Sequence, residues 1–277
     1  MKHDDASIPA DVDNAALPLA GQRILVTRPA HQANALCDNL RQLGAEPIRF
    51  PTLAITPIAQ HDSGYPLLKQ RFLDLDLYHA VIFISANAVR LAYEQIDQYW
   101  PQLPLQITWL PVGSATASTL QRLLPEAVAP SHNDSAAMDS ENLLALPELQ
   151  QLSGKRVLIC RGEGGRELLA QTLQQRGAQL DYAELYRREI PVYSQTEIES
   201  IIYKSAASAM LVSSGEALLN LVALTGTNDE PHSKLIDLPV VLPSQRVAAL
   251  ASKLGFTCVR VAANATDAAM ITVLTAK

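Results

Sequence analysis

The sequence has little of what extracellular, membrane or nucleic-acid-coating proteins need. Its three cysteines, Cys37, Cys160 and Cys258, form no CxxC pair and lie in apolar runs, so we expect small core residues in a reducing cytoplasm. No stretch comes near the roughly 18 uninterrupted apolar residues of a membrane-spanning helix. Lys and Arg number 22 against 28 Asp and Glu, and this net charge of −6 disfavours a protein that coats DNA or RNA.

Signatures of export and of common cofactors are absent as well. Residues 1–20 are rich in aspartate and lack the apolar segment of a signal peptide, so we expect a disordered N-terminal tail on a cytoplasmic protein. The run RGEGGRE at 161–167 lacks the GxGxxG spacing of a dinucleotide site, and no phosphate-binding loop of the form GxxxxGK[ST] occurs. None of the six histidines is paired at the spacing of metal ligands.

What the sequence does contain is an internal repeat. The 277 residues suggest about two domains. Residues 21–45 align without gaps to residues 154–178, with nine identical pairs. Each copy has the pattern of a buried strand, a loop, an amphipathic helix and a glycine that ends the helix.

Similar pairs continue along both halves of the chain. Residues 80–89 resemble 209–218, residues 109–120 resemble 240–250, and residues 139–146 resemble 266–274. Both halves therefore show the same series of four strand–helix units. Strands that alternate with helices predict an α/β fold of two similar domains, each a parallel sheet flanked by helices.

Two extended segments occupy equivalent places in the repeat. FPTLAITPI at 50–58 contains two prolines that disfavour a helix, and AELYRREIP at 183–191 alternates and ends in proline. We expect them to form a two-stranded linker between the domains. Two arrangements fit: sequential domains, or interleaved domains in which the chain crosses over and later returns. Periodicity alone does not choose between them.

Polar residues follow most of the predicted strands. In open parallel sheets, ligands bind at the carboxyl ends of the strands, where helix N-termini attract carboxylates and phosphates. For any single serine or threonine, helix capping alone is the favoured role, but seven such loops favour an anionic ligand. The candidate binding residues are Arg28, Ser85, Asn87, Ser114, Thr116, Arg161, Gly162, Ser213, Ser214, Ser244 and Thr266. Tyr186, on the second crossing segment, is by its residue type best explained as a packed aromatic.

The order of several short motifs resembles one known family. ILVTRPAHQANAL, FISANAV, VGSATAS, the block GKRVLICRGEGGRELLAQTLQQRGA followed by LYRR, and the closing ATDAAM together resemble uroporphyrinogen-III synthase over about residues 21–277. One departure is LPSQRVA in the third unit of the second half, where an IGxxTA-like sequence is usual. It puts a side-chain role there in doubt.

This resemblance implies an activity. It implies a lyase that closes linear hydroxymethylbilane into uroporphyrinogen III with loss of water and inversion of the last pyrrole ring, without metal or organic cofactor. Tyr186 in LYRR matches a tyrosine of the family's cleft, and Thr116, Ser85, Ser213 and Thr266 match other cleft residues. Because a phenol is a weak acid at neutral pH, we expect Tyr186 to assist through a hydrogen bond.

The resemblance also implies an organisation. It selects interleaved domains, with residues 21–53 plus 190–277 in one, residues 57–186 in the other, and crossing linkers at about 51–58 and 183–191. The expected partner is the small linear tetrapyrrole, bound by a monomer that makes at most transient contact with the preceding enzyme of the pathway. No nucleic acid and no membrane are expected.

Two rival functions remain. A two-domain anion- or solute-binding protein would close on its ligand without chemistry, and the absence of a signal peptide weighs against it. A sugar or phosphate transferase would need a metal-binding acid pair or a phosphate loop, neither of which the sequence shows.

Overall fold

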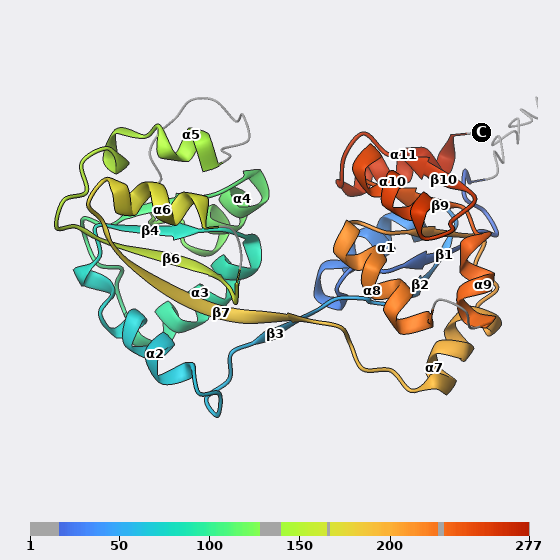
Figure 1. Ribbon diagram of the computed structural model, residues 1–277, viewed down its shortest axis with the longest axis horizontal. Helices are drawn as coiled ribbons and strands as arrows, with labels where there is room; N and C mark the ends of the chain where they lie inside the picture. The colour runs from blue at the N-terminus through green and yellow to red at the C-terminus, as the bar shows by residue number, and fades with distance from the viewer. Residues whose placement is uncertain (1–16, 128–139, 165–166, 227–229, 277) are drawn as a thin grey trace, which may run out of the picture. The chain divides into compact units, whose positions relative to one another are not determined.

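The computed structural model describes residues 17–127, 140–164, 167–226 and 230–276. The chain divides into two compact units (Figure 1). Unit 1 combines the chain up to Ala54 with the chain from Ile190 onward, and unit 2 is Ile55–Glu189. The chain therefore enters unit 2 once and leaves it once.

The start of the described chain corrects the predicted tail. Residues 1–16 lie outside the described residues, whereas residues 17–21 form a turn. Leu19 is only 3% exposed, joins a core cluster of unit 1 and donates its backbone N–H to the Leu43 carbonyl at 2.9 Å. Placing residues 17–20 in a disordered tail was therefore wrong, because one leucine in a polar segment fills the core below the first repeat.

Unit 1 contains a five-stranded sheet whose described pairings are all parallel. Its order is β10 (Val259–Val261), β9 (Val240–Leu242), β8 (Ala209–Leu211), β1 (Arg23–Val26) and β2 (Glu46–Arg49). Its helices are α1 (Asn34–Gln42), α7 (Gln195–Glu199), α8 (Gly215–Thr225), α9 (Glu230–Ile236), α10 (Gln245–Lys253) and α11 (Asp267–Thr275), with a 3₁₀ turn at Ala30–Gln32 and a π-turn at Ser200–Lys204.

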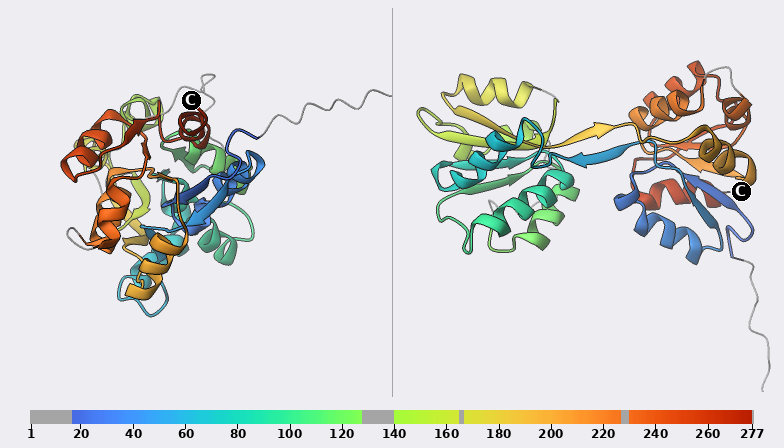
Figure 2. Two further views of the ribbon diagram at one scale, coloured as in Figure 1. Left: turned by 90° about the vertical axis from the view of Figure 1, so that its right-hand side faces the viewer. Right: turned by 90° about the horizontal axis from the view of Figure 1, so that it is seen from below.

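Unit 2 contains the second five-stranded sheet. Its order is β3 (Ala54–Pro57), β7 (Gln179–Glu189), β6 (Arg156–Gly162), β4 (Ala80–Phe83) and β5 (Thr108–Pro111). Four of these strands run parallel, and the edge strand β3 runs opposite to β7 (Figure 2). The helices are α2 (Tyr65–Leu73), α3 (Ala86–Tyr99), α4 (Ser114–Leu123), α5 (Ser140–Leu144) and α6 (Leu168–Gln175), with 3₁₀ turns at Leu75–Leu77 and Pro147–Leu149.

Each sheet is covered by helices on both faces, which explains its continuous apolar strands. In unit 2, Val81 and Phe83 of β4 pack with α2, α3 and α4, while Ala80 and Ile82 pack with α5 and α6. The two cores of unit 1 divide its strands in the same alternating way. Cys160 and Cys37 are buried as expected, but Cys258 is only half-buried. The α/β fold class predicted from the sequence is confirmed.

The two repeat copies have the same register. Arg23 of β1 lies opposite Glu46 of β2, and Arg156 of β6 lies opposite Gln179 of β7, so both pairs are related by the repeat offset of 133 residues. The helix between the strands ends in each copy at a glycine with positive φ. These are Gly44 at φ +90° and Gly177 at φ +88°.

Sheet membership separates the two arrangements that periodicity left open. β1 pairs with β8, and β6 pairs with β4. The first repeat copy therefore shares a sheet with strands of the second half of the chain, and the second copy with strands of the first half. This is the interleaved arrangement.

Candidate functional site

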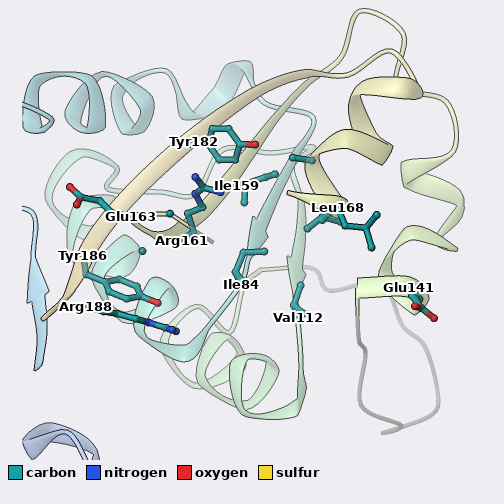
Figure 3. A pocket seen from close by; sticks show the side chains of 14 residues that line it. Ile84, Val112, Glu141, Ile159, Arg161, Glu163, Leu168, Tyr182, Tyr186 and Arg188 are labelled. Atoms are coloured by element: carbon teal, nitrogen blue, oxygen red, sulfur yellow. The ribbon is translucent and has the colours of Figure 1, made fainter. Parts of the chain in front are cut away.

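A cavity of the described structure lies within unit 2, at the carboxyl ends of its strands. It has a volume of about 590 Å³. Ile84 and Val112, which line it, directly follow β4 and β5 (Figure 3). Gly162, also in the lining, ends β6. Polar groups enter from β6, β7 and the loop after β6, and apolar ones from α6. These lining residues are Arg161, Glu163, Tyr182, Tyr186, Arg188, Leu168 and Leu169.

Tyr186 reaches this site because β7 contains a bulge. Arg161 lies opposite Glu184, but the next residue of β6, Gly162, lies opposite Tyr186, so Leu185 is the extra residue. Successive side chains of a strand point to opposite faces, and one extra residue reverses that order beyond it. Tyr186 is thereby moved to the face that carries α3, where it is 2% exposed.

The Tyr186 hydroxyl is held by the first cap of α3. It lies 3.0 Å from the Ser85 Oγ, and this Oγ accepts the backbone N–H of Ala88 at 3.1 Å. Ser85 has φ −159° and ψ 159°, the extended backbone of an N-cap. A predicted binding residue and the predicted catalytic residue are therefore in direct contact.

Gly162, another predicted binding residue, lies under the Tyr186 ring. A Cβ added to Gly162 would lie 2.6 Å from Cε2 and 2.8 Å from Cζ of that ring. Contacts this short are far inside van der Waals distance, so only glycine admits the ring at its present place.

Arg161 lies on the other face of β6, against β7. Its guanidinium carbon lies 4.1 Å from the centre of the Tyr182 ring, and its Nη2 donates to Glu184 at 3.1 Å. The Arg161 side chain is 15% exposed, and its Nε is buried without a hydrogen-bond partner among the described residues. Arg161 therefore lines the cavity, while its unpartnered Nε lies inside the protein.

The other predicted residues of unit 2 lie outside the lining of this cavity. Asn87 accepts from the Arg90 guanidinium at 3.1 Å, one turn along α3. Ser114 is exposed in the first turn of α4, directly after Gly113, which has φ +87°. Thr116 is buried in the same helix, at 4% exposure.

In unit 1, three of the predicted residues are N-caps. Ser214, Ser244 and Thr266 each accept the N–H of the residue three positions ahead, at 3.0, 3.4 and 3.3 Å. Ser213 precedes the cap of α8 and is half-buried.

Arg28 has a structural contact set in unit 1. It forms an ion pair with Asp267 in the first turn of α11 and donates to the Ala265 carbonyl at 3.2 Å. These contacts fasten α11 to the end of β1. Arg161, at the equivalent repeat position, also forms an ion pair, with Glu184, and in addition stacks on the Tyr182 ring.

Sequence reasoning missed several residues of the cavity. Tyr182 and Arg188 lie on β7, on either side of Tyr186, and Glu163 follows β6 directly. The strand period of two predicts that Tyr182 and Glu184 share a face, so the alternating pattern contained a signal for Tyr182. Glu163 accepts from Arg187 at 2.9 Å, a contact between neighbouring strands that no local pattern indicates.

The described residues lack a membrane-spanning helix and a metal-binding cluster. No helix in them is long and apolar enough to cross a membrane. No group of three or more His, Cys, Asp and Glu side chains in the described ranges is arranged to hold a metal ion.

Comparison with known sequences gives a consistent result. A sequence profile described as Uroporphyrinogen-III synthase HemD matches residues 34–272. Uroporphyrinogen-III synthase of Escherichia coli K12 is 34% identical over 254 residues, which cover 91% of this chain and 99% of that protein. The Salmonella typhimurium LT2 protein of the same name is also 34% identical, over 251 residues with the same coverage.

Solved structures of two uroporphyrinogen-III synthases share this fold. Uroporphyrinogen-III synthetase from Helicobacter pylori 26695 matches with a TM-score of 0.56 and 14% identity, covering 91% of this chain and 97% of that one. A mutant uroporphyrinogen III synthase from Thermus thermophilus matches with a TM-score of 0.55 and 17% identity, covering 91% and 96%. At these identities the likeness concerns the fold. From the profile and the full-length relatives, the chain belongs to the uroporphyrinogen-III synthase family.

Proposed function

We propose that this protein closes hydroxymethylbilane into uroporphyrinogen III, with loss of water and inversion of the last pyrrole ring. Family membership over most of the chain supports this reaction. The structural observation on which the proposal depends most is the Tyr186 hydroxyl, which is held by Ser85 beside a cavity at the carboxyl ends of parallel strands.

Ring closure begins with the loss of the hydroxymethyl oxygen. The pyrrole nitrogen supplies the electrons that break the C–O bond, and the oxygen leaves as water once it has gained a proton. The exposed carbon is then attacked by the substituted carbon of the last ring, which gives a spiro intermediate. The old bond between that ring carbon and its methylene bridge then breaks, and the bridge forms a new bond to the free α-carbon of the same ring. That carbon loses its proton as the ring regains its aromaticity, so one proton is gained, one is lost, and the net loss is one water.

In this proposal Tyr186 assists the departure of the oxygen. A phenol is too weak an acid to transfer its proton completely at neutral pH, but its hydrogen bond strengthens as negative charge develops on the leaving oxygen. The main task of the protein is geometric, because the unaided bilane also cyclises, without inversion. The bound chain must therefore be held so that only the inverting attack is within reach.

The substrate has eight carboxylates, and the binding residues are proposed as their donors. Arg161 is proposed as one of them in unit 2, since it lines the cavity. Arg28 is proposed to act mainly through structure, given its ion pair with Asp267. The side-chain and backbone donors proposed to complete the set are those at Asn87, Ser114, Thr116, Gly162, Ser213, Ser214, Ser244 and Thr266, while Ser85 acts at the Tyr186 hydroxyl.

The organisation that accompanies this function is proposed in the same terms. Residues 21–53 with 190–277 form one domain and residues 57–186 the other, close to the two compact units. The three unpaired cysteines support a cytoplasmic location. A monomer that receives its substrate from the preceding enzyme is the assembly we propose.

One assay tests the function. The protein is incubated with freshly generated hydroxymethylbilane, the product is oxidised and the porphyrin isomers are resolved. We expect isomer III in excess of the isomer I that forms without protein. A solute-binding protein or a transferase would leave the isomer I of the uncatalysed reaction unchanged, and that outcome would reject the proposal.

A further inference from the structure

We propose that Ser85 is a positioning residue for Tyr186: it donates its own hydroxyl hydrogen to the phenol oxygen, so that the phenol hydrogen points at the ligand. The result is a chain of donors from the Ala88 N–H to the Ser85 hydroxyl, to the Tyr186 hydroxyl and then to the leaving oxygen. This inference rests on the proposed function and deepens it.

The hydrogen-bond capacity of Ser85 fits this order. A serine hydroxyl has one hydrogen and two lone pairs. The Ala88 N–H, 3.1 Å away, uses one lone pair, and the Tyr186 oxygen lies 3.0 Å from the same Oγ. If Ser85 donates, the phenol hydrogen remains available for a ligand. If Tyr186 donates instead, its only hydrogen is used inside the protein.

A chain of donors also strengthens its last member. Each hydrogen bond polarises the next, and a helix N-terminus favours negative charge near it. Since Ser85 is the N-cap of α3, charge that develops on the phenol oxygen is stabilised by that end of the helix. The Ser85 hydroxyl and the N-terminus of α3 thus both support Tyr186 as a donor.

Two features of β6 and β7 make the contact between Tyr186 and Ser85 possible. The bulge at Leu185 moves Tyr186 to the face of α3, and Gly162 leaves room for the ring to lie across β6. Without the bulge, Tyr186 would share the face of Tyr182 and Glu184, away from Ser85. The bulge in β7 and Gly162 beside it in β6 therefore both allow Tyr186 to reach Ser85.

The equivalent cap of unit 1 lacks this arrangement. Ser214 corresponds to Ser85 in the repeat and has nearly the same backbone, with φ −159° and ψ 162°. Ser214 accepts from N–H groups of its own helix, from Ala217 at its hydroxyl and from Leu218 at its backbone carbonyl. Among the described residues, the link from cap to tyrosine is thus a property of unit 2.

A double-mutant cycle tests the proposal. Ser85→Ala, Tyr186→Phe and the double variant are assayed with hydroxymethylbilane, and kcat and KM are measured separately. We expect Ser85→Ala to lower kcat about three- to tenfold with KM within about twofold, the effect of one hydrogen bond. In the Tyr186→Phe background the same substitution should change kcat less than about twofold. Ser85→Thr, which keeps the hydroxyl, should restore most of the loss.

Ser85→Ala also removes the cap of α3, and this effect must be separated from the loss of the hydrogen bond to Tyr186. Ser194→Ala removes the cap of α7, which accepts from Glu197 at 3.3 Å, and should lower the melting temperature without changing kcat. Ser85→Gly removes the hydroxyl at a smaller cost to the helix, so it replaces Ser85→Ala if that variant unfolds. Ser85→Ala and Ser85→Gly should lower kcat by about the same factor.

The outcomes distinguish the two proposals. If the wild-type protein forms no isomer III, the proposed function and this inference both fail. If the wild-type protein forms isomer III but the effects of Ser85→Ala and Tyr186→Phe multiply in the double variant, Ser85 acts independently of Tyr186 and only this inference fails. A loss confined to KM would likewise overturn it and return Ser85 to direct substrate binding.

Discussion

At the scale of single residues, the Tyr186 hydroxyl offers the most direct test of the chemistry. Tyr186→Phe keeps the ring in its buried position and removes only the hydroxyl. Loss of one hydrogen bond to a leaving group that gains charge costs about 1.5–3 kcal/mol, so kcat should fall roughly ten- to a hundredfold. Steady-state kinetics with resolved isomers should show mostly isomer III, formed more slowly.

Two results would contradict this role. An unchanged kcat would make Tyr186 a packed aromatic without a part in proton donation. Release of mainly isomer I by a folded variant would mean that Tyr186 steers the bilane.

Arg161 allows a test of substrate binding. Its side chain already stacks on Tyr182 and pairs with the partly exposed Glu184, so its removal should change stability only modestly. If Arg161 binds a carboxylate, Arg161→Ala should raise KM about ten- to a hundredfold while kcat changes little. Arg28→Ala is the matched variant of the other repeat copy and should mainly lower the melting temperature, because it breaks the ion pair with Asp267. The reverse pattern would assign Arg161 to structure.

A third residue controls the acid stability of unit 2. Asp181 accepts from Arg156 at 2.7 Å, Tyr78 at 2.9 Å and Arg71 at 2.8 Å. Partial burial opposes ionisation of Asp181, but the hydrogen bonds from Arg156 and Tyr78 and the charge of Arg71 outweigh it, so its pKa lies below the usual value. Burial, and then the hydrogen bond to Asp181, raise the pKa of Tyr78.

The lowered pKa of Asp181 determines how the stability of the protein changes with pH. A lowered folded-state pKa contributes stability that is present above the ordinary value of about 3.9 and is lost as the pH falls through the folded value. Asp181→Asn should cost about 2 kcal/mol at pH 7, and the difference from the wild type should shrink toward pH 3. Urea unfolding at pH 7, 5 and 3.5 measures it, and a difference independent of pH would contradict the prediction.

At the scale of elements, the glycine that ends α6 is expected to be essential for the turn into β7. Gly177 has φ +88°, and an added Cβ would lie 2.9 Å from the Ser153 Cα. Gly154, in the same turn region, has φ +73° but open space around it. Both alanine variants cost about 1 kcal/mol for the left-handed backbone, and Gly177→Ala should cost at least about 1 kcal/mol more for the clash. Chemical denaturation of the two variants compares them, and equal losses would show that the Ser153 segment gives way.

At the scale of the whole molecule, the two units are expected to differ in their ability to fold alone. Unit 2 is one continuous stretch, Ile55–Glu189, with two core clusters of its own. A fragment of residues 55–189 should therefore unfold cooperatively and show dispersed NMR signals, without cyclising the bilane. Residues 1–54 alone should stay unfolded, since β1 lies between β2 and β8, which comes from the other half of the chain. A fragment 55–189 that lacks a cooperative transition would show that unit 2 depends on unit 1.

The sequence by itself determined the features that depend on nearby residues. Hydrophobic periodicity predicted the alternating strands and helices. Capping preferences favoured a cap at each serine and threonine of these loops. The prediction holds for Ser85, Ser214, Ser244 and Thr266 but not for Ser114, Thr116 and Ser213. These signals depend only on neighbouring residues, because one helical turn or one strand repeat spans only a few residues.

Only the tertiary structure decided what depends on distant residues. The pairing of β1 with β8 joins segments some 185 residues apart, as between Ile24 and Ala209, and no pattern within either half specifies it. The bulge at Leu185 reverses the face of Tyr186, and a period of two read from the sequence gives the wrong side. A single inserted residue in a ladder has no local signature, because its energy depends on the partner strand and on the space that Gly162 leaves. The contact between Tyr186 and Ser85 was therefore decided by packing.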